Sequence, residues 1–178
     1  MPNIKYVGKN LFIEKLSVSN IVKKEVTPFY IYSENQIKEN YIKFVKTFEK
    51  INPLICFAAK SNSNLYILRS LRKLGAGTDV VSVGELLKSL KAGIKPNKIV
   101  FSGVGKTEEE LKIAINKKIL LINCESESEA RIINKIAKRS NKKVPIGFRL
   151  NPNIDAKTHK KISTGKADNK FGVSIKNF

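Results

Sequence analysis

Lys60 stands at the end of a short apolar run and is followed at once by polar turn residues. Residues 56–64 read Cys-Phe-Ala-Ala-Lys-Ser-Asn-Ser-Asn. An apolar run that stops at Ser and Asn predicts a buried strand reaching its end, so we expect the Lys60 amine at the lip of a sheet with an apolar wall behind it. Burial disfavours the ammonium form, and a neutral amine there would suit a Schiff base with a carbonyl, including the aldehyde of pyridoxal phosphate. A lysine that only reaches from a strand end into solvent is the simpler alternative.

An acid and a guanidinium fall at the ends of other predicted strands. Asp79 and Arg149 occupy such positions, as do three neutral polar residues, Ser82, Ser102 and Asn123. The carboxyl ends of parallel strands meet at one rim, so Asp79 could neutralise or orient the lysine and Arg149 could hold an anionic group. Asp79 could equally be a turn or capping residue. Arg149 is harder to explain in that way, because an arginine within an apolar strand needs a partner.

Glu85 and His159 each have a structural explanation beside a functional one. Glu85 completes the sequence Ser-Val-Gly-Glu over residues 82–85, which is a capping box by itself. His159 is the only histidine of the chain and lies in the polar segment 151–172, whose turn residues predict a long loop. Long polar loops at the rim of a barrel often form lids over a site. A lone loop histidine, however, is more often solvated than catalytic.

Strand-like and helix-like segments alternate from residue 54 onward. Each of the first four strand-like segments precedes a helical pattern, and successive strands start about 20 to 25 residues apart. The helical segments lie near 64–74 and 83–92, and after the capping boxes that begin at Thr107 and Ser126. The predicted strands are 54–59, 78–82, 99–102, 119–123 and 144–150.

This alternation predicts βα units and a parallel sheet, and the nearly continuous apolar strands predict that both faces of the sheet are covered. A doubly wound open sheet and a (β/α)8 barrel both fit this pattern. No G-x-G-x-x-G sequence follows the first strand, which makes a dinucleotide-binding fold less favoured. Residues 103–107 match only the tail of a P-loop, so we interpret them as a βα turn with Thr107 as the N-cap of the next helix.

The sequence before residue 54 differs from this pattern. Residues 1–27 are mixed and show no sustained period, so they could be a lead-in segment or one strand of another domain. Residues 27–32 are apolar, aromatic and β-branched, which predicts a strand. Ser33 and Gln36 then form a capping-box pattern, and the apolar spacing after them predicts an amphipathic helix that ends before the Asn-Pro pair at 52–53.

The composition suits one domain of ordinary size, with 178 residues of which 42% are hydrophobic. No apolar run approaches the roughly 20 residues of a membrane span, and the first residues lack the apolar stretch of a signal peptide. We therefore expect a cytoplasmic protein with no membrane partner. Cys56 and Cys124 make neither a disulfide framework nor a metal set, so both are expected to be reduced and structural.

The net charge of +19 raises the question of a nucleic-acid or anionic-surface partner. The lysines are scattered along the whole chain, and only five residues are arginine. No basic block is interleaved with aromatic residues and no groove-reading motif is present, so we expect no nucleic-acid partner. A noncatalytic basic nucleic-acid-binding protein is the alternative from another functional class. Salt-dependent retention on DNA without uptake of pyridoxal phosphate would favour that alternative.

Five ordered motifs between about residue 27 and the end resemble the fold-type III pyridoxal-phosphate decarboxylases. The segment 57–64, Phe-Ala-Ala-Lys-Ser-Asn-Ser-Asn, is similar to the cofactor-lysine motif of that family, and the segment 75–86 is similar to its second signature. The resemblance is narrowed to the diaminopimelate decarboxylase family by the segments 99–107, 151–152 and 159–165 with 170–172.

The resemblance implies a (β/α)8 TIM barrel of the alanine racemase-like type over residues 28–178, incomplete here with about five βα strands. Residues 1–27 would be a lead-in segment that could belong to a missing β domain. The implied activity is that of a carboxy-lyase that uses pyridoxal 5'-phosphate to decarboxylate meso-2,6-diaminopimelate to L-lysine. Lys60 would carry the cofactor, and Asp79 and Arg149 match family positions close to it.

The resemblance also bears on other residues and on the partners. Glu85 matches a family acid, and the segment that contains His159 matches the mobile active-site loop of the family. Cys124 lies in a Cys-Glu-Ser segment like that of the family's catalytic cysteine, which stands much nearer the C-terminus, so we expect Cys124 to be an ordinary core residue. The full-length enzyme would be a homodimer acting on a small-molecule amino acid.

The chief departure from the family is length. A complete barrel, the late Gly-rich phosphate loops, the histidine that stacks on the cofactor ring, the acid that pairs with its nitrogen and the substrate-binding residues are missing here. We therefore expect a fragment or one half of a split gene, inactive on its own and with uncovered sheet edges. A related decarboxylase for arginine, ornithine or carboxynorspermidine is the nearest functional alternative.

Overall fold

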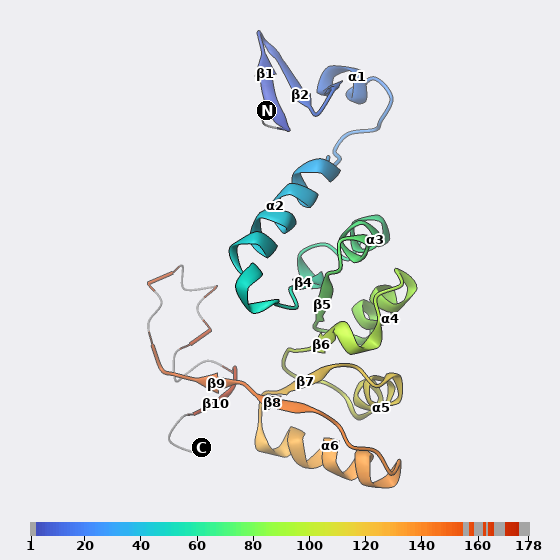
Figure 1. The fold of residues 1–178 in the computed structure, drawn as a ribbon, viewed down its shortest axis with the longest axis vertical. Coiled ribbons are helices and arrows are strands. Elements are labelled where there is room, and N and C mark those ends of the chain that lie inside the picture. Colours follow the sequence, from blue (N-terminus) through green and yellow to red (C-terminus); the bar gives the residue numbers. More distant parts are fainter. Residues whose placement is uncertain (1–2, 155–156, 159–161, 163, 166–169, 175–178) are drawn as a thin grey trace. The chain divides into compact units, whose positions relative to one another are not determined.

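The computed structural model describes residues 3–154, 157–158, 162, 164–165 and 170–174. The chain divides into two compact units, Met1–Pro53 and Leu54–Phe178 (Figure 1). The first unit combines a small antiparallel sheet with helices, and the second alternates strands with helices. Among the residues described, no helix is long and apolar enough to cross a membrane.

The first unit opens with an antiparallel sheet and not with a single strand. Its strands, paired in chain order, are β1 (Ile4–Val7), β2 (Asn10–Ile13) and β3 (Leu16–Ser17). Gly8 and Glu14, with φ of 59° and 56°, supply the left-handed residues at the two turns. Helix α1 (Val18–Val22) follows β3 directly.

Helix α2 (Glu34–Thr47) begins where Ser33 and Gln36 predict it. The Ser33 hydroxyl oxygen accepts the Gln36 N–H at 3.0 Å, and the hydroxyl donates to the Glu14 carboxylate at 2.7 Å. The pKa of Glu14 lies below its ordinary value because the Asn35 N–H and the Ser33 hydroxyl donate to its carboxylate. The 3-10 turn η1 (Glu49–Ile51) then ends the helical part of this unit.

The strand predicted over residues 27–32 is wrong, because this segment forms an irregular connection. Tyr30 and Tyr32 are 90% and 57% exposed. Pro28 has no N–H to donate, and none of the described strands pairs with the segment. A β-prone composition makes a strand only where another strand lies alongside to satisfy its backbone groups.

The second unit is a parallel sheet in which each strand pairs with the next one along the chain, as predicted. Its strands are β4 (Cys56–Ala58), β5 (Gly77–Val80), β6 (Ile99–Phe101), β7 (Leu121–Cys124) and β8 (Ile146–Phe148). The intervening helices are α3 (Leu65–Lys73), α4 (Val83–Lys91), α5 (Glu108–Lys117) and α6 (Glu127–Arg139). All five strands are shorter than predicted: β4, β7 and β8 begin two residues later, and all except β7 end one or two residues earlier.

Helices α3 to α6 lie together on one side of the sheet (Figure 1). A doubly wound sheet carries helices on both faces, whereas a barrel carries them only outside its ring of strands. The described part of the second unit is therefore an arc of a (β/α)8 barrel, which decides between the two predicted architectures.

The hydrophobic core of the second unit lies between the sheet and these helices. Its largest fully buried side chains come from both layers and include Ile99, Phe101 and Ile122 from strands and Leu68, Leu86 and Leu111 from helices. Burial of each such side chain contributes about 1.5–3 kcal/mol. The apolar spacing of each helix thus faces the apolar runs of the strands, as the sequence predicts.

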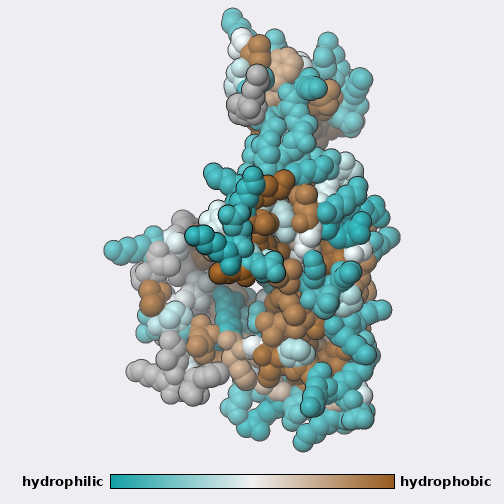
Figure 2. All heavy atoms as spheres, viewed as in Figure 1, coloured by the Kyte–Doolittle hydropathy of each residue, from teal (hydrophilic) through white to brown (hydrophobic). Residues whose placement is uncertain are grey.

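Hydrophobic residues also gather on the surface of the second unit. Figure 2 shows them in the region where Figure 1 places β6 to β8. Leu120, Ile146 and Leu150 are 37%, 39% and 46% exposed. In the described residues β8 is an end strand of the sheet, so one of its edges has no neighbour. Uncovered apolar surface at this edge agrees with the expectation for an incomplete barrel.

Helix α5 is tied to the helix before it. Thr107 and Glu110 form the predicted capping box at its start. The Glu110 carboxylate also accepts the Val83 N–H in the first turn of α4, at 3.0 Å. These backbone donors, first Thr107 and then Val83, lower the pKa of Glu110. One acid therefore joins two consecutive βα units.

Two short strands stand apart from the main sheet. Strands β9 (Leu150–Asn151) and β10 (Val173–Ser174) pair in parallel, although 21 residues separate them in the sequence. The predicted active-site loop lies in the sequence between these two strands. Because β9 and β10 pair, the residues before and after that sequence lie side by side.

Candidate active site

A hollow of about 690 Å³ lies at the carboxyl ends of the strands of the second unit. Its volume is in the range of small-molecule sites. Three predicted site residues, Lys60, Asp79 and Arg149, line it together. Glu85 is not among the lining residues, and His159 lies outside the described residues. The remaining polar and aromatic lining side chains are Ser102, Asn123, Glu125, Phe148, Lys170 and Phe171.

Lys60 lies on the 3-10 turn η2 (Ala59–Ser61), directly after β4. Ala59 beside it is fully buried, but Lys60 itself is exposed, so the expected burial of its amine is wrong in the described structure. The Ser61 hydroxyl closes the turn by donating to the Ala58 carbonyl at 2.8 Å. Because the strand ends two residues before the lysine, the side chain starts above the sheet and reaches the wall of the hollow.

A chain of hydrogen bonds joins the ends of β5, β6 and β7. The Asn123 amide donates to Ser102 Oγ at 3.1 Å, and the Ser102 hydroxyl donates to Asp79 Oδ1 at 2.6 Å. The Asn123 nitrogen is only a donor, so the Ser102 proton is committed to Asp79. Gly147 on β8 leaves room for this amide, because an added Cβ would lie 2.8 Å from Asn123 Oδ1. The carboxylate of Asp79 is thus held at the rim by one of its oxygens.

Arg149 follows β8 and has the partner that its apolar surroundings require. Its Nη1 lies 3.2 Å from Glu125 Oε1, and its guanidinium carbon lies 4.6 Å from the centre of the Phe171 ring. The Glu125 side chain is 6% exposed and that of Arg149 is 37% exposed. The acid therefore balances the guanidinium from the protein side, while Arg149 remains accessible on the side of the hollow.

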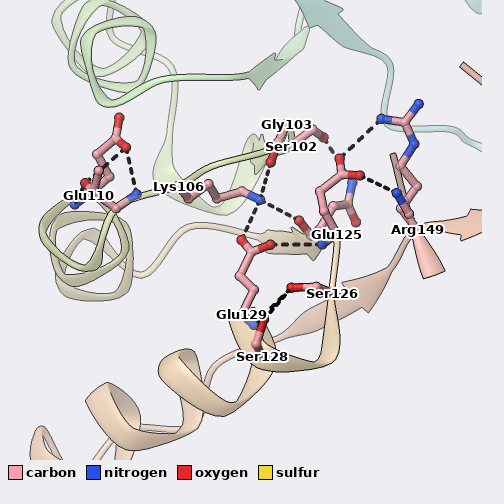
Figure 3. Close-up of polar contacts among 12 residues, drawn as sticks. Ser102, Gly103, Lys106, Glu110, Glu125, Ser126, Ser128, Glu129 and Arg149 are labelled. Carbon is pink, nitrogen blue, oxygen red and sulfur yellow. Dashed lines mark hydrogen bonds and ion pairs between the residues drawn. The ribbon is translucent and has the colours of Figure 1, made fainter. Parts of the chain in front are cut away.

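Lys106 is a buried ammonium behind the wall of the hollow. Its Nζ lies 2.7 Å from each of three acceptors, the carbonyl oxygens of Gly103 and Asn123 and the carboxylate of Glu129. Figure 3 shows the side chain pointing between these groups. The three contacts use its three donors, and only 1% of the side chain is exposed. Lys106 is therefore no nucleophile, and it holds the backbone of two residues that line the hollow.

The sequence analysis missed the roles of Lys106, Glu125 and Glu129. Lys106 contacts an acid 23 residues later, and Glu125 contacts an arginine 24 residues later. Both separations equal one βα repeat, and consecutive βα turns of a parallel sheet are neighbours in space. Opposite charges in consecutive βα turns, one repeat apart, were the signal that could have revealed both pairs.

Glu85 serves the turn before helix α4. Its carboxylate accepts the Val81 N–H at 2.9 Å, and its own N–H donates to the Ser82 hydroxyl oxygen at 3.2 Å. The predicted capping box therefore forms only in part: Ser82 caps the helix, but the Glu85 carboxylate binds the N–H of Val81 and not that of the N-cap residue Ser82. These contacts also fix the chain just after Asp79, so Glu85 supports the rim from behind.

Cys124 is fully buried in β7, as expected for a core residue. Burial, together with the nearby Glu129 carboxylate, raises the pKa of its thiol to about 11. At about pH 8 roughly one thiol in a thousand is then a thiolate. We expect iodoacetamide to leave Cys124 unmodified in the native chain and to alkylate it after denaturation, as read by peptide mass spectrometry. Rapid alkylation of the native protein would contradict this burial.

Comparison with known proteins places this site in context. Residues 34–178 match the pyridoxal binding domain of the pyridoxal-dependent decarboxylases. The diaminopimelate decarboxylase of Aquifex aeolicus is 45% identical over 175 residues, 98% of this chain and 41% of that protein. The Campylobacter jejuni diaminopimelate decarboxylase is 51% identical over 149 residues, 84% of this chain and 37% of that protein.

The fold is also similar to that of a solved diaminopimelate decarboxylase structure. The Helicobacter pylori diaminopimelate decarboxylase, complexed with L-lysine, superposes with a TM-score of 0.86 at 47% identity, covering 89% of this chain and 40% of that one. The chain spans about two fifths of the length of the relatives it matches, since it covers 41%, 37% and 40% of these three proteins.

Proposed function

Because the chain belongs to the pyridoxal-dependent decarboxylase family, we propose that its complete protein is a diaminopimelate decarboxylase. The reaction removes one carboxylate of meso-2,6-diaminopimelate as CO2 and leaves L-lysine. The observation that carries this proposal is the meeting of Lys60, Asp79 and Arg149 in one hollow of a pyridoxal-binding domain. The choice of substrate is supported by relatives of that name at 45% and 51% identity.

The residues of the hollow fit pyridoxal 5'-phosphate, which combines an aldehyde, an aromatic ring and a phosphate. Lys60 offers an exposed amine for the aldehyde, and Phe148 and Phe171 offer apolar surface for a ring. Arg149 and Lys170 add positive charge along the same wall, which suits an anionic ligand. The volume of about 690 Å³ is large enough for a ligand of this size.

When bound, the cofactor supplies an electron sink for the electron pair that departing CO2 leaves behind. In this proposal the Lys60 amine would hold the cofactor through its aldehyde, whose oxygen would leave as water. Asp79, whose carboxylate accepts the Ser102 hydroxyl, would offer an acceptor in the same hollow, and Arg149 would provide positive charge for an anionic group of the ligand. Glu85 holds the turn after Asp79 in place.

We further propose that residues 1–27 belong to a β domain and residues 28–178 to the barrel. The antiparallel strands β1 to β3 support a β domain at the start of the chain. His159 is assigned to an active-site loop, and the complete enzyme to a homodimer that binds a small amino acid. The L-lysine in the Helicobacter pylori relative supports the amino-acid ligand. The 178 residues alone are expected not to decarboxylate, because the strands that the structure describes form only an arc of the barrel.

A fusion protein tests the proposed function. The chain is joined to the C-terminal remainder of the Aquifex aeolicus relative, treated with pyridoxal phosphate and reduced with borohydride. We expect the pyridoxyl label on Lys60, together with release of CO2 and lysine from meso-diaminopimelate. Lys60→Ala is expected to abolish both, because it removes the amine that follows β4 directly and lines the hollow. Lys112→Ala, which removes an exposed lysine of α5, is the control and should retain both.

Other outcomes would contradict parts of this proposal. A label on a different lysine, or on none, in a folded fusion protein would refute the role of Lys60. Turnover of arginine or ornithine without turnover of meso-diaminopimelate would refute the substrate while leaving the cofactor assignment intact.

A further inference from the structure

Glu125 is a buried acid to which the proposed reaction gives no role. The residue is 8% exposed, and both of its carboxylate oxygens have a partner. Oε1 lies 3.2 Å from Arg149 Nη1, and Oε2 accepts the Gly172 N–H at 2.9 Å. A buried carboxylate is costly unless its oxygens are satisfied. Its partners lie 24 and 47 residues further along the chain, so the carboxylate joins three distant segments.

The side chain of Glu125 is not needed to begin helix α6. The N-cap is Ser126, whose hydroxyl oxygen accepts the Glu129 N–H at 3.2 Å. The Glu129 carboxylate in turn accepts the backbone N–H of Glu125 at 2.9 Å. The local helix start is therefore complete without the Glu125 carboxylate, which extends toward Arg149 instead (Figure 3).

Residues 171–173, which lead into β10 and are called the returning segment below, contact the backbone of Arg149. The Val173 N–H donates to the Arg149 carbonyl at 2.8 Å, and this bond begins the pairing of β10 with β9. Gly172 has a φ of 72°, and an added Cβ would lie 2.6 Å from the Arg149 carbonyl oxygen. Glycine is therefore required here for the backbone to come close enough to donate its N–H to Glu125.

The returning segment also meets the guanidinium of Arg149. The Phe171 ring covers it at 4.6 Å, and the Asn151 amide holds the Phe171 carbonyl at 3.1 Å. A planar guanidinium with one edge on a carboxylate and one face on an aromatic ring has a fixed orientation. We call the group of Glu125, Arg149, Phe171 and Gly172 the clasp.

We propose that Glu125 is a positioning residue for the hollow. Its carboxylate fastens Arg149 and strand β10 together, so that the guanidinium and the Phe171 ring form one fixed part of the wall that Lys60 also lines. This inference deepens the proposed function and rests on it only for the identity of the ligand, because the clasp is built entirely from residues of this chain.

The 178-residue chain tests the clasp without any cofactor. Glu125→Gln removes the charge that holds Arg149 but keeps an oxygen for the Gly172 N–H. Glu127→Gln is the matched control, because it removes the same charge from an exposed pair with Arg131. Nuclear magnetic resonance of the guanidinium groups distinguishes an effect on Arg149 from an effect on Arg131, since the chain has only five arginines to assign.

We expect the guanidinium N–H signals of Arg149 to be sharp in the unaltered chain and to broaden in Glu125→Gln. Glu127→Gln should alter only the signals of Arg131. Hydrogen exchange at Gly172 should accelerate about tenfold or more in Glu125→Ala, which loses a charged acceptor. Glu125→Gln should accelerate this exchange less, because the retained amide oxygen restores part of the contact. In the fusion protein, Glu125→Gln should lower kcat/KM by about 10- to 100-fold, and Glu127→Gln should not.

An Arg149 signal that is already broad in the unaltered chain, or an equal response to both glutamine variants, would overturn the clasp. If Glu125→Gln does not fold, Phe171→Leu removes the aromatic face instead and should broaden the same Arg149 signal. An unchanged signal in that variant would also overturn the proposal. If the clasp signals behave as expected and the fusion protein carries no label on Lys60, the proposed function fails while the clasp stands.

Discussion

Lys106→Met is expected to lower the free energy of unfolding by about 3–5 kcal/mol, the usual cost of breaking a buried ion pair by removing one partner. Methionine is unbranched like lysine and matches it as far as Cε, but it has no donor. The carbonyl oxygens of Gly103 and Asn123 lose their donor, and Glu129, whose side chain is 10% exposed, keeps a charge without a counterion.

Urea unfolding followed by circular dichroism measures this loss, since the chain has no tryptophan to report by fluorescence. Lys112→Met is the control, because it removes a lysine from exposed pairs with Glu108 and Glu109 and should change stability little. The double variant Lys106→Met with Glu129→Gln should recover part of the loss, because it leaves no unpaired charge. Equal stability of the Lys106→Met and Lys112→Met proteins would show that the buried network does not exist in solution.

Gly77→Ala is expected to destabilise the chain by at least about 3 kcal/mol, at the upper end of the cost of overpacking. Gly77 begins β5, and an added Cβ would lie 2.2 Å from the Lys98 carbonyl oxygen and 2.8 Å from Cys56 Sγ. Lys98 ends the turn η3 (Pro96–Lys98), and its carbonyl is backbone, which cannot turn away as a side chain does. Since β5 pairs with both β4 and β6, any shift is passed to two neighbouring strands.

Gly84→Ala is the control for Gly77→Ala, because the same substitution is expected to leave stability unchanged or to raise it. Gly84 is exposed in the first turn of α4, and the nearest atom to an added Cβ is Ser82 Oγ at 3.8 Å. Alanine is favoured over glycine in a helix by up to about 1 kcal/mol, so this variant should be equally or more stable. The same urea titrations measure both variants. A Gly77→Ala protein as stable as Gly84→Ala would mean that β5 and η3 lie farther apart than described.

The order of strands and helices could be predicted because its signals are local. Helix starts are predicted by N-cap patterns that span only four residues, as at Ser33, Thr107 and Ser126. Buried strands are predicted by short apolar runs. The strand predicted at 27–32 failed because a strand also needs a neighbour, and no local signal says whether one lies alongside. The antiparallel strands within residues 1–27 were missed because these residues show no sustained hydrophobic alternation. The strands form because they pair with one another, which no local signal reveals.

The site could be predicted only in part. Lys60, Asp79 and Arg149 were expected at one rim because the carboxyl ends of parallel strands meet there, and all three line one hollow. The burial of Lys60 was not predicted correctly, because η2 lifts it off the strand. Among so many scattered lysines, nothing local marks Lys106 as the buried one, since its burial depends on an acid one βα repeat away.

Contacts of Glu110 and Lys106 cross from one βα unit to the next. Glu110 reaches back to the Val83 N–H of the preceding helix, and Lys106 reaches forward to Glu129 of the following one. In a series of repeated units, total stability is the sum of what each unit contributes and of the coupling between adjacent units. Strong nearest-neighbour coupling makes the units cooperative, so they melt together. Damage to a single turn is consequently felt along the whole arc and does not stay where it occurs.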